Sequence, residues 1–352
     1  MRDVGVSHVA CLFVMFTQGR LAMPLLGREN VRHATLLFCA EGVTVRTTGA
    51  GEGNKEMHII QFIHPGKEFP VGDTNSDRRP DSRYNVHWNM KNHHHRRLVK
   101  HNGRYVDTNG VLHEGDLLFW TEWEGCTTAK RLESQNGLIN AHYLHEVVYP
   151  VYANRRNGAT TCCQNTDPCV FGRSFKYSNC RQRGPRCTLR NLQQGSLIAF
   201  MSMIQGVYYL DTIFVVDTSQ EYSTDKTGTV NCSAEYRTLT LNRLPAHKNF
   251  RFYRGVTCPD NGKKVNALFS FTPSRLYSGL DNQHDFARCA LDIDAINQAV
   301  GRSVFSGSYL QGIKQTLSIE QETWKTWKEI VRQMTVQGFV CGVNFDWPRR
   351  QA

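Results

Sequence analysis

The side chains best suited to chemistry gather first in a basic, histidine-rich stretch between residues 78 and 104. This stretch holds eight lysines and arginines, five histidines and one acid, with Tyr84 and Trp88 among them. Cations neutralise phosphates, and aromatic faces between them accept unstacked bases. The alternative is an ordinary solvated surface. The pattern predicts nucleic-acid contacts from Arg78, Arg79, Arg83, Arg96, Arg97, Lys100 and Arg104.

A pair of carboxylates, Glu122 and Glu124, lies next to Trp120 and Trp123. On a strand the two carboxylates would project from one face, about 7 Å apart. That separation suits binding of a divalent cation or a division into acid and base. The indole neighbours would partly desolvate the carboxylates and favour the protonated acid near neutral pH. We predict that both are catalytic, with a divalent metal as the candidate cofactor, and a solvated strand face is the alternative.

Two further candidates follow a β-branched and aromatic run at residues 57–63, which predicts a core strand ended by Pro65 and Gly66. His64 and Glu68 would then lie in a loop at the end of that strand, a common place for chemistry. His94 from the basic stretch completes the predicted catalytic set.

Five cysteines crowd a later segment, at positions 162, 163, 169, 180 and 187. Their spacing departs from the paired knuckles of structural zinc sites, so ordinary thiols are the preferred interpretation. A nucleophilic Cys180 beside Arg181 lacks an identified base. The residues between the cysteines mix aromatics with polar side chains that can read base edges. We add four of these to the predicted nucleic-acid contacts: Arg173, Lys176, Arg181 and Gln182.

Several enzyme classes are disfavoured because their signatures are absent. The sequence has no phosphate-binding Gly-x4-Gly-Lys-Ser/Thr loop, no Gly-x-Gly-x-x-Gly, no His-Glu-x-x-His and no Gly-x-Ser-x-Gly. The zinc deaminase pattern is absent as well.

The elements that must position these residues are mostly strands. Further strands are predicted at residues 236–241, 250–256, 267–272 and 339–345, and a β-hairpin at residues 192–216. Helix signals concentrate near the end. Ser318 and Gln321 form a capping signal, after which Trp324, Trp327, Val331 and Met334 recur at helical spacing, and Gly338 follows. We predict an α+β fold, β-rich, with a partly closed barrel or mixed sheet and a C-terminal amphipathic helix.

The composition describes a basic globular protein. The chain has 352 residues, a formal net charge of +11, 40% hydrophobic and 21% charged residues, which together allow a substantial core. The longest apolar stretch, Val9–Phe16, is too short for a membrane helix, so no membrane partner is predicted. The twelve cysteines do not indicate a small disulfide-built domain, and we predict reduced thiols and a cytoplasmic location.

Residues 1–56 differ from the rest and contribute six basic and five acidic residues. They end at residues 51–56, which are encoded by purine-rich codons and directly precede Met57. Such a run before a methionine resembles a ribosome-binding site translated by mistake. Two interpretations are therefore open: a mis-assigned start or a real N-terminal arm. Residues 57–352 would form the core, with two candidate subdomains at 57–160 and 161–352.

Two segments, Leu112–Trp120 and Leu192–Phe200, share the pattern Leu-x-x-Gly-(Asp/Ser)-Leu followed by apolar residues. A Gly-centred turn before a buried strand explains each. With the strand at residues 208–216 that follows Gly206, they resemble the hairpins of PUA-like β-barrels, which include ASCH and EVE domains. The resemblance implies a small barrel that recognises a modified or flipped base or an RNA. Some members are linked to nucleotide modification and phage defence, and some process bases or cleave strands.

Together these features predict a protein that binds nucleic acid and recognises or processes its bases. If it is an enzyme, it is a hydrolase that cleaves strands or excises bases. Two alternatives stay open: a non-catalytic module that binds a polyanion, and an enzyme acting on a small molecule.

Overall fold

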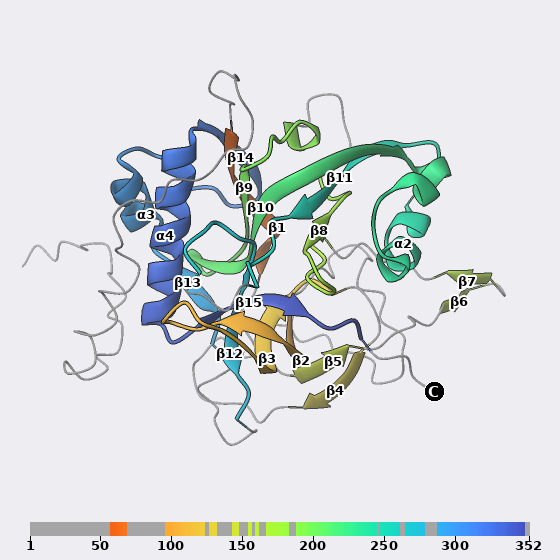
Figure 1. Ribbon diagram of the computed structural model, residues 1–352, viewed down its shortest axis with the longest axis horizontal. Helices are drawn as coiled ribbons and strands as arrows, with labels where there is room; N and C mark the ends of the chain where they lie inside the picture. The colour runs from red at the N-terminus through yellow and green to blue at the C-terminus, as the bar shows by residue number, and fades with distance from the viewer. Residues whose placement is uncertain are drawn as a thin grey trace, which may run out of the picture.

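The computed structural model describes residues 57–68, 96–123, 127–131, 143–147, 154–156, 159–161, 167–182, 188–244, 246–260, 265–278 and 287–348. Two sheets with helices at their margins make up this part of the chain, as Figure 1 shows. The predicted β-rich α+β class is therefore confirmed. Among the described residues, no helix combines the length and apolarity needed to cross a bilayer.

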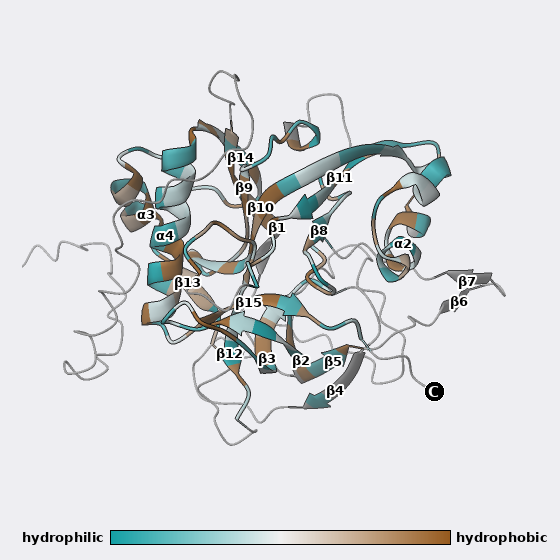
Figure 2. Ribbon diagram, in the orientation of Figure 1, coloured by the Kyte–Doolittle hydropathy of each residue, from teal (hydrophilic) through white to brown (hydrophobic). Residues whose placement is uncertain are grey.

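The first sheet is mixed and has seven strands. Its order is β14 (Gly312–Ser318), β1 (Met57–Glu68), β9 (Leu197–Ile204), β10 (Val207–Ser223), β11 (Asn249–Gly255) and β8 (Lys176–Tyr177), and β13 (Cys289–Leu291) pairs with β10. β1 runs parallel to β9 and antiparallel to β14. The far end of β10 is largely hydrophilic and arcs away toward α2 (Ala234–Leu239) (Figure 2).

The second sheet contains a closed ring. Its order is β15 (Val340–Phe345), β12 (Thr272–Leu276), β3 (Leu112–Thr121), β2 (Arg97–Val106), β5 (Tyr143–Val147) and β4 (Thr127–Arg131). Because β15 also pairs with β2, the strands β2, β3, β12 and β15 close into a small barrel. A separate hairpin joins β6 (Asn154–Arg156) to β7 (Ala159–Thr161). Strands from before and after residue 160 pair within both of the larger sheets.

The predicted hairpin at residues 192–216 is present as β9 and β10. Gln205 and Gly206 connect the strands with φ values of 49° and 85°, the positive values that a two-residue hairpin turn needs. All residues of β9 are buried, so this strand lies at the centre of the fold. The Gly-centred turn is confirmed at Gly195, where φ is 84°. It is wrong at Gly115, which pairs with Gly103 inside the regular β2–β3 ladder.

The predicted C-terminal helix is α4 (Glu320–Val336), followed by Gly338 with a φ of 80°. Trp327, Val331 and Met334 are buried along one side, so the amphipathic pattern packs into the core. The first turn is fixed by Glu322 rather than by the predicted Ser318–Gln321 pair, because the Glu322 carboxylate accepts a bond from the Ile319 N–H at 3.2 Å.

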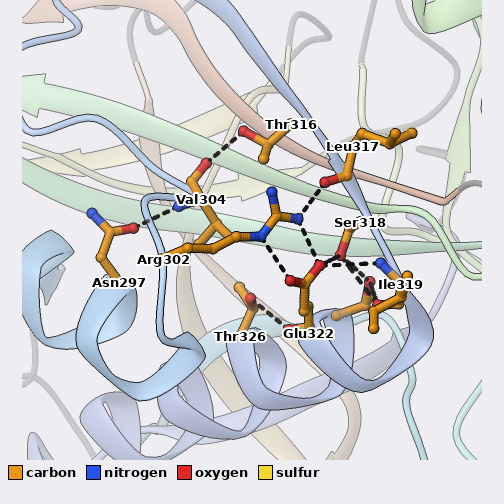
Figure 3. A network of polar contacts seen from close by, with 10 residues as sticks. Asn297, Arg302, Val304, Thr316, Leu317, Ser318, Ile319, Glu322 and Thr326 are labelled. Carbon is orange, nitrogen blue, oxygen red and sulfur yellow. Dashed lines mark hydrogen bonds and ion pairs between the residues drawn. The ribbon is translucent and has the colours of Figure 1, made fainter.

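The start of α4 is tied to the chain that leads from α3 (Ile293–Val300) to β14. Figure 3 shows the Arg302 guanidinium between the Leu317 carbonyl and the Glu322 carboxylate. Its Nε donates to Glu322 Oε1 at 2.7 Å. This exposed pair fixes the approach of the helix to the edge of the first sheet.

Side-chain amides of α4 cover one edge of β13. Gln337 donates to the Ala290 carbonyl at 2.7 Å and accepts from the Ala290 N–H at 2.9 Å. Gln333, one turn earlier, makes the same two bonds with Asp292, at 3.1 and 2.8 Å. These side chains thereby satisfy backbone N–H and C=O groups that would otherwise pair with a neighbouring strand.

Within the described ranges, three 3-10 turns occupy Thr188–Arg190 (η1), Thr224–Thr229 (η2) and Leu241–Arg243 (η3). The strand predicted at residues 236–241 is wrong: Ser233 accepts a bond from the Tyr236 N–H and caps the helix α2. The strand predicted at residues 250–256 is confirmed by β11, and that at 339–345 by β15. The strand predicted at 267–272 reaches the ladder only at its end, where β12 begins.

Candidate functional site: a buried arginine cluster

The two sheets meet at a group of buried charged residues, here called the arginine cluster. Its members are Arg96, Glu122, Ser202, Asp211 and Arg288. Each is at most 5% exposed, and they come from the ends of β2 and β3, from β9 and β10, and from the residue before β13. The fold thus collects residues that lie far apart in the sequence.

Backbone register explains how two of these residues meet. In the β2–β3 ladder Arg97 lies opposite Thr121, so Arg96 and Glu122 face each other just beyond its end. Arg96 Nη1 and Glu122 Oε2 are 2.7 Å apart. Both residues lie at the open end of a regular hairpin, and their opposite charges pair across it.

A bulge in β10 positions Asp211. Leu210 pairs with Met201 of β9 while Thr212 pairs with Phe200, so Asp211 is the extra residue between them. Bulges re-aim side chains and are frequent beside functional sites. Here the bulge directs a carboxylate toward two arginines.

Asp211 is the centre of the cluster. Its Oδ2 accepts from Arg96 Nε at 2.8 Å and from Ser202 Oγ at 2.6 Å, and its Oδ1 accepts from Arg288 Nη2 at 2.9 Å. Arg288 Nη2 also bonds to Ser202 Oγ. The ions alternate in sign from Glu122 through Arg96 and Asp211 to Arg288, so every charge has an opposite neighbour.

Two aromatic rings accompany the last ion of this chain. The Arg288 guanidinium lies over the Trp120 ring, 4.7 Å from its centroid, and 5.5 Å from the centroid of Tyr209. Both rings are only partly buried, whereas Arg288 is 5% exposed. The cluster therefore lies next to two side chains that are partly exposed.

Burying four ions only to stabilise the fold would cost desolvation free energy. Buried ion pairs recover their desolvation cost only with good geometry and complete hydrogen bonding, and apolar replacements are often as stable. A cluster of four ions at the junction of two sheets is therefore a candidate binding site for a polar ligand.

A further carboxylate, Asp167, is fully buried near Glu122. Asp167 Oδ2 accepts from the Asn179 and Cys180 N–H groups, each at 2.7 Å, and Oδ1 accepts from the Ser178 N–H at 3.2 Å. Burial raises the pKa of Asp167 to about 7, opposed by these three bonds and aided by the charge of Glu122.

Two of the predicted phosphate contacts lie inside the protein instead. Arg96 is 5% exposed and held by Glu122 and Asp211, and Arg97 is 1% exposed. Burial, followed by the charge of Arg97, lowers the pKa of His145 to about 3, so this histidine is neutral. The surface role predicted for Arg96 and Arg97 is therefore wrong.

The remaining described residues of the predicted nucleic-acid contacts divide into three pairs. Lys100 pairs with Asp116 at 3.3 Å and Arg104 with Asp260 at 2.8 Å, so acids partly neutralise both. Arg173 and Arg181 are exposed.

Lys176 and Gln182 are buried, which corrects their predicted role. Lys176 Nζ donates to the carbonyls of Phe171 and Ser174, at 2.8 and 2.6 Å. Gln182 bonds through its amide to the backbone of Arg251. Neither side chain reaches the surface as predicted.

Glu122 is the one predicted catalytic side chain that the structure describes. It follows β3 and is 4% exposed, so the alternative of a solvated strand face is wrong for this residue. His64 and Glu68 belong to the backbone of β1, beyond the predicted strand end, and their side chains lie outside the described residues. Also outside the described residues lie Glu124, His94, Arg78, Arg79 and Arg83.

The described cysteines do not form a metal centre. Cys169 and Cys180 are buried free thiols, and burial raises the pKa of Cys169 to about 11. Within the part of the chain that the structure describes, no group of three histidine, cysteine or acidic side chains is placed to hold a metal ion.

No protein-family model, curated protein or solved structure matches this chain.

Sequence reasoning missed most of the cluster. Its members Ser202, Asp211 and Arg288 carry no local motif, although a lone Asp211 inside the apolar run at residues 208–216 is a usable signal. A charged residue in a central strand is almost never buried without a partner.

Proposed function

We propose that this protein binds nucleic acid and recognises an unpaired base at the arginine cluster. The observation that carries the proposal is Arg288, fixed by Asp211 over the partly exposed rings of Trp120 and Tyr209. Unpaired bases stack on aromatic and guanidinium planes and bond through their edges to arginine and carboxylate groups. The cluster supplies all of these groups in one place.

The charge of the whole chain supports the same ligand class. A formal net charge of +11 attracts a polyanion, and Arg173 and Arg181 are exposed cations. The phosphate contacts are thus assigned to the general surface charge, while the buried cluster supplies the base contact. This division matches the usual roles of backbone and base contacts.

Six described cysteines are free thiols, including the half-buried Cys232 and Cys258. Free thiols persist in reducing compartments. A cytoplasmic location is therefore part of the proposal.

The test is binding of a fluorescein-labelled single-stranded oligonucleotide, measured by fluorescence anisotropy. We expect the single strand to bind more tightly than its duplex, because pairing hides the base edges. Affinity should fall as salt rises from 50 to 200 mM. Arg288→Lys keeps the charge but loses the planar fork, and should weaken binding about tenfold.

Arg332→Lys is the matched control. Arg332 lies on the exposed side of α4 and pairs with Glu329 at 2.7 Å. This variant should bind like the wild type. Equal affinities of wild type and Arg288→Lys, or no binding of single strands, would overturn the proposal.

A hydrolytic action on the bound base is the second candidate function, favoured by two buried carboxylates, Glu122 and Asp167, that interact electrostatically. Incubation with modified and unmodified DNA and RNA, with and without Mg²⁺, should then release bases or cleave strands. Glu122→Gln should abolish turnover. Product formation that survives this substitution, or no product from any substrate, would exclude the role.

A further inference from the structure

The face of the second sheet that carries Trp120 continues beyond the arginine cluster. In the β2–β3 ladder Leu98 lies opposite Trp120, and Lys100 follows Leu98 by two residues. Side chains on a strand alternate between its two faces, so these three share one face with the ion pair of Arg96 and Glu122. Lys100 lies about 7 Å further from the cluster than Leu98. The cluster is therefore the first row of a longer face.

A second half-buried aromatic ring, that of Tyr277, belongs to the same face. Tyr277 follows β12, and its N–H donates to the carbonyl of Asp116 on β3 at 2.9 Å. The rings of Trp120 and Tyr277 both pack against three buried leucines, Leu98, Leu118 and Leu144. Both side chains stay partly exposed. Two aromatic rings thus cover one apolar patch of the sheet.

A partly exposed ion pair lies beside Tyr277. Lys100 Nζ is 4.3 Å from the centroid of the Tyr277 ring and 3.3 Å from Asp116 Oδ2. The Lys100 and Asp116 side chains are 25% and 46% exposed. Within the described part of the chain neither side chain makes another hydrogen bond or ion pair. Asp116 Oδ1 and further N–H groups of Lys100 can therefore bond to a ligand while the pair stays intact.

The charges around this pair cancel. Glu146 of β5 lies opposite Lys100. Lys130 of β4 lies opposite Leu144, on the same face of the sheet. Two cations thus accompany two acids, whereas phosphate binding needs an excess of cations. The surface suits an uncharged base that bonds through its edge.

Guanine is the base whose edge matches the pair. Its Watson–Crick edge presents the acceptor O6 beside two N–H donors, N1 and the 2-amino group, whereas adenine, cytosine and thymine each present a single N–H-bearing group there. Two neighbouring N–H donors suit a carboxylate, as they do in arginine–carboxylate pairs. Asp116 would accept from both, and Lys100 would donate to O6.

We propose that Lys100, Asp116 and Tyr277 form a second base subsite, which binds a guanine of the same strand whose unpaired base lies at Trp120. The inference rests on the proposed function and adds a sequence preference to it. Because both subsites lie on one face of the β2–β3 ladder, a single strand can occupy them together. The ligand class is a single strand with guanine next to the base at the arginine cluster.

The test is fluorescence anisotropy with labelled DNA hexanucleotides and the full chain. The probes are hexathymidylate, the same strand with guanine at its third position, and that strand with hypoxanthine in place of guanine. We expect guanine to raise the affinity about tenfold, and hypoxanthine, which lacks the 2-amino group, to lose most of this gain. Equal affinities for all three strands would overturn the inference and leave the proposed function standing, whereas no binding of any strand would overturn both.

A substitution assigns the preference to the pair. Asp116→Asn replaces one acceptor oxygen by a donor, so this variant should bind the guanine strand no more tightly than hexathymidylate. Asp217→Asn, at a partly exposed ion pair of β10, is the matched control and should keep the tenfold preference. An Asp116→Asn protein that still prefers guanine would overturn the inference. The hypoxanthine probe tests the same contact on the wild-type chain if the variant fails to fold.

Discussion

Replacing Asp211 by Asn should destabilise the protein strongly, because this carboxylate neutralises two buried guanidinium groups. Its side chain is 3% exposed and contacts Arg96 at 2.8 Å and Arg288 at 2.9 Å. Without its charge, Glu122 alone would oppose two buried cations. Removing one partner of a buried ion pair costs about 3–5 kcal/mol, a large part of the roughly 5–15 kcal/mol that stabilises a typical domain.

The assay is urea denaturation followed by tryptophan fluorescence, comparing midpoints at constant slope. Asp217→Asn is the matched control, because Asp217 lies on the same strand and pairs with Arg254, but their side chains are 31% and 40% exposed. It should cost less than about 1 kcal/mol. Adding Arg288→Met to Asp211→Asn restores neutrality and should recover part of the loss. Equal costs for Asp211→Asn and Asp217→Asn would refute the reasoning.

Two further predictions concern a turn and a pH response. Gly206→Ala should cost about 1 kcal/mol in the same assay, because φ is 85° there while the space around it is open; no loss would contradict the positive φ. His145 has a folded-state pKa of about 3, below its unfolded value of 6.5, so its contribution to stability is lost as pH falls below 6.5. Between pH 7 and pH 5 this loss should be about 2 kcal/mol, and His145→Leu should flatten that part of the profile. An unchanged profile in the variant would show that His145 is protonated in the folded protein.

The elements that were predicted correctly are those that short-range sequence patterns specify. The hairpin around Gly206 and the helix α4 were identified because a turn residue or an apolar stripe specifies each one. Gly115 shows the limit, since the same pattern that makes a turn at Gly195 is a regular strand pair there. The PUA-like resemblance drew on both patterns and stays a prediction.

The site was harder to predict because its contacts are long-range. Arg96 and Asp211 are 115 positions apart, and Arg288 and Asp211 are 77 apart. Counting charges between residues 78 and 104 identified Arg96 but could not show that it is buried. Burial depends on which strand lies against it, and that is a property of the assembled sheets.

The central claim is that a base binds against Trp120 at the arginine cluster. Fluorine NMR of protein labelled with 5-fluorotryptophan tests it directly, since the chain has six tryptophans and Trp120→Phe assigns one resonance. Adding single-stranded DNA should shift the Trp120 resonance and leave that of Trp327, a buried residue of α4, unchanged. DNA binding that leaves the Trp120 resonance in place would contradict the claim.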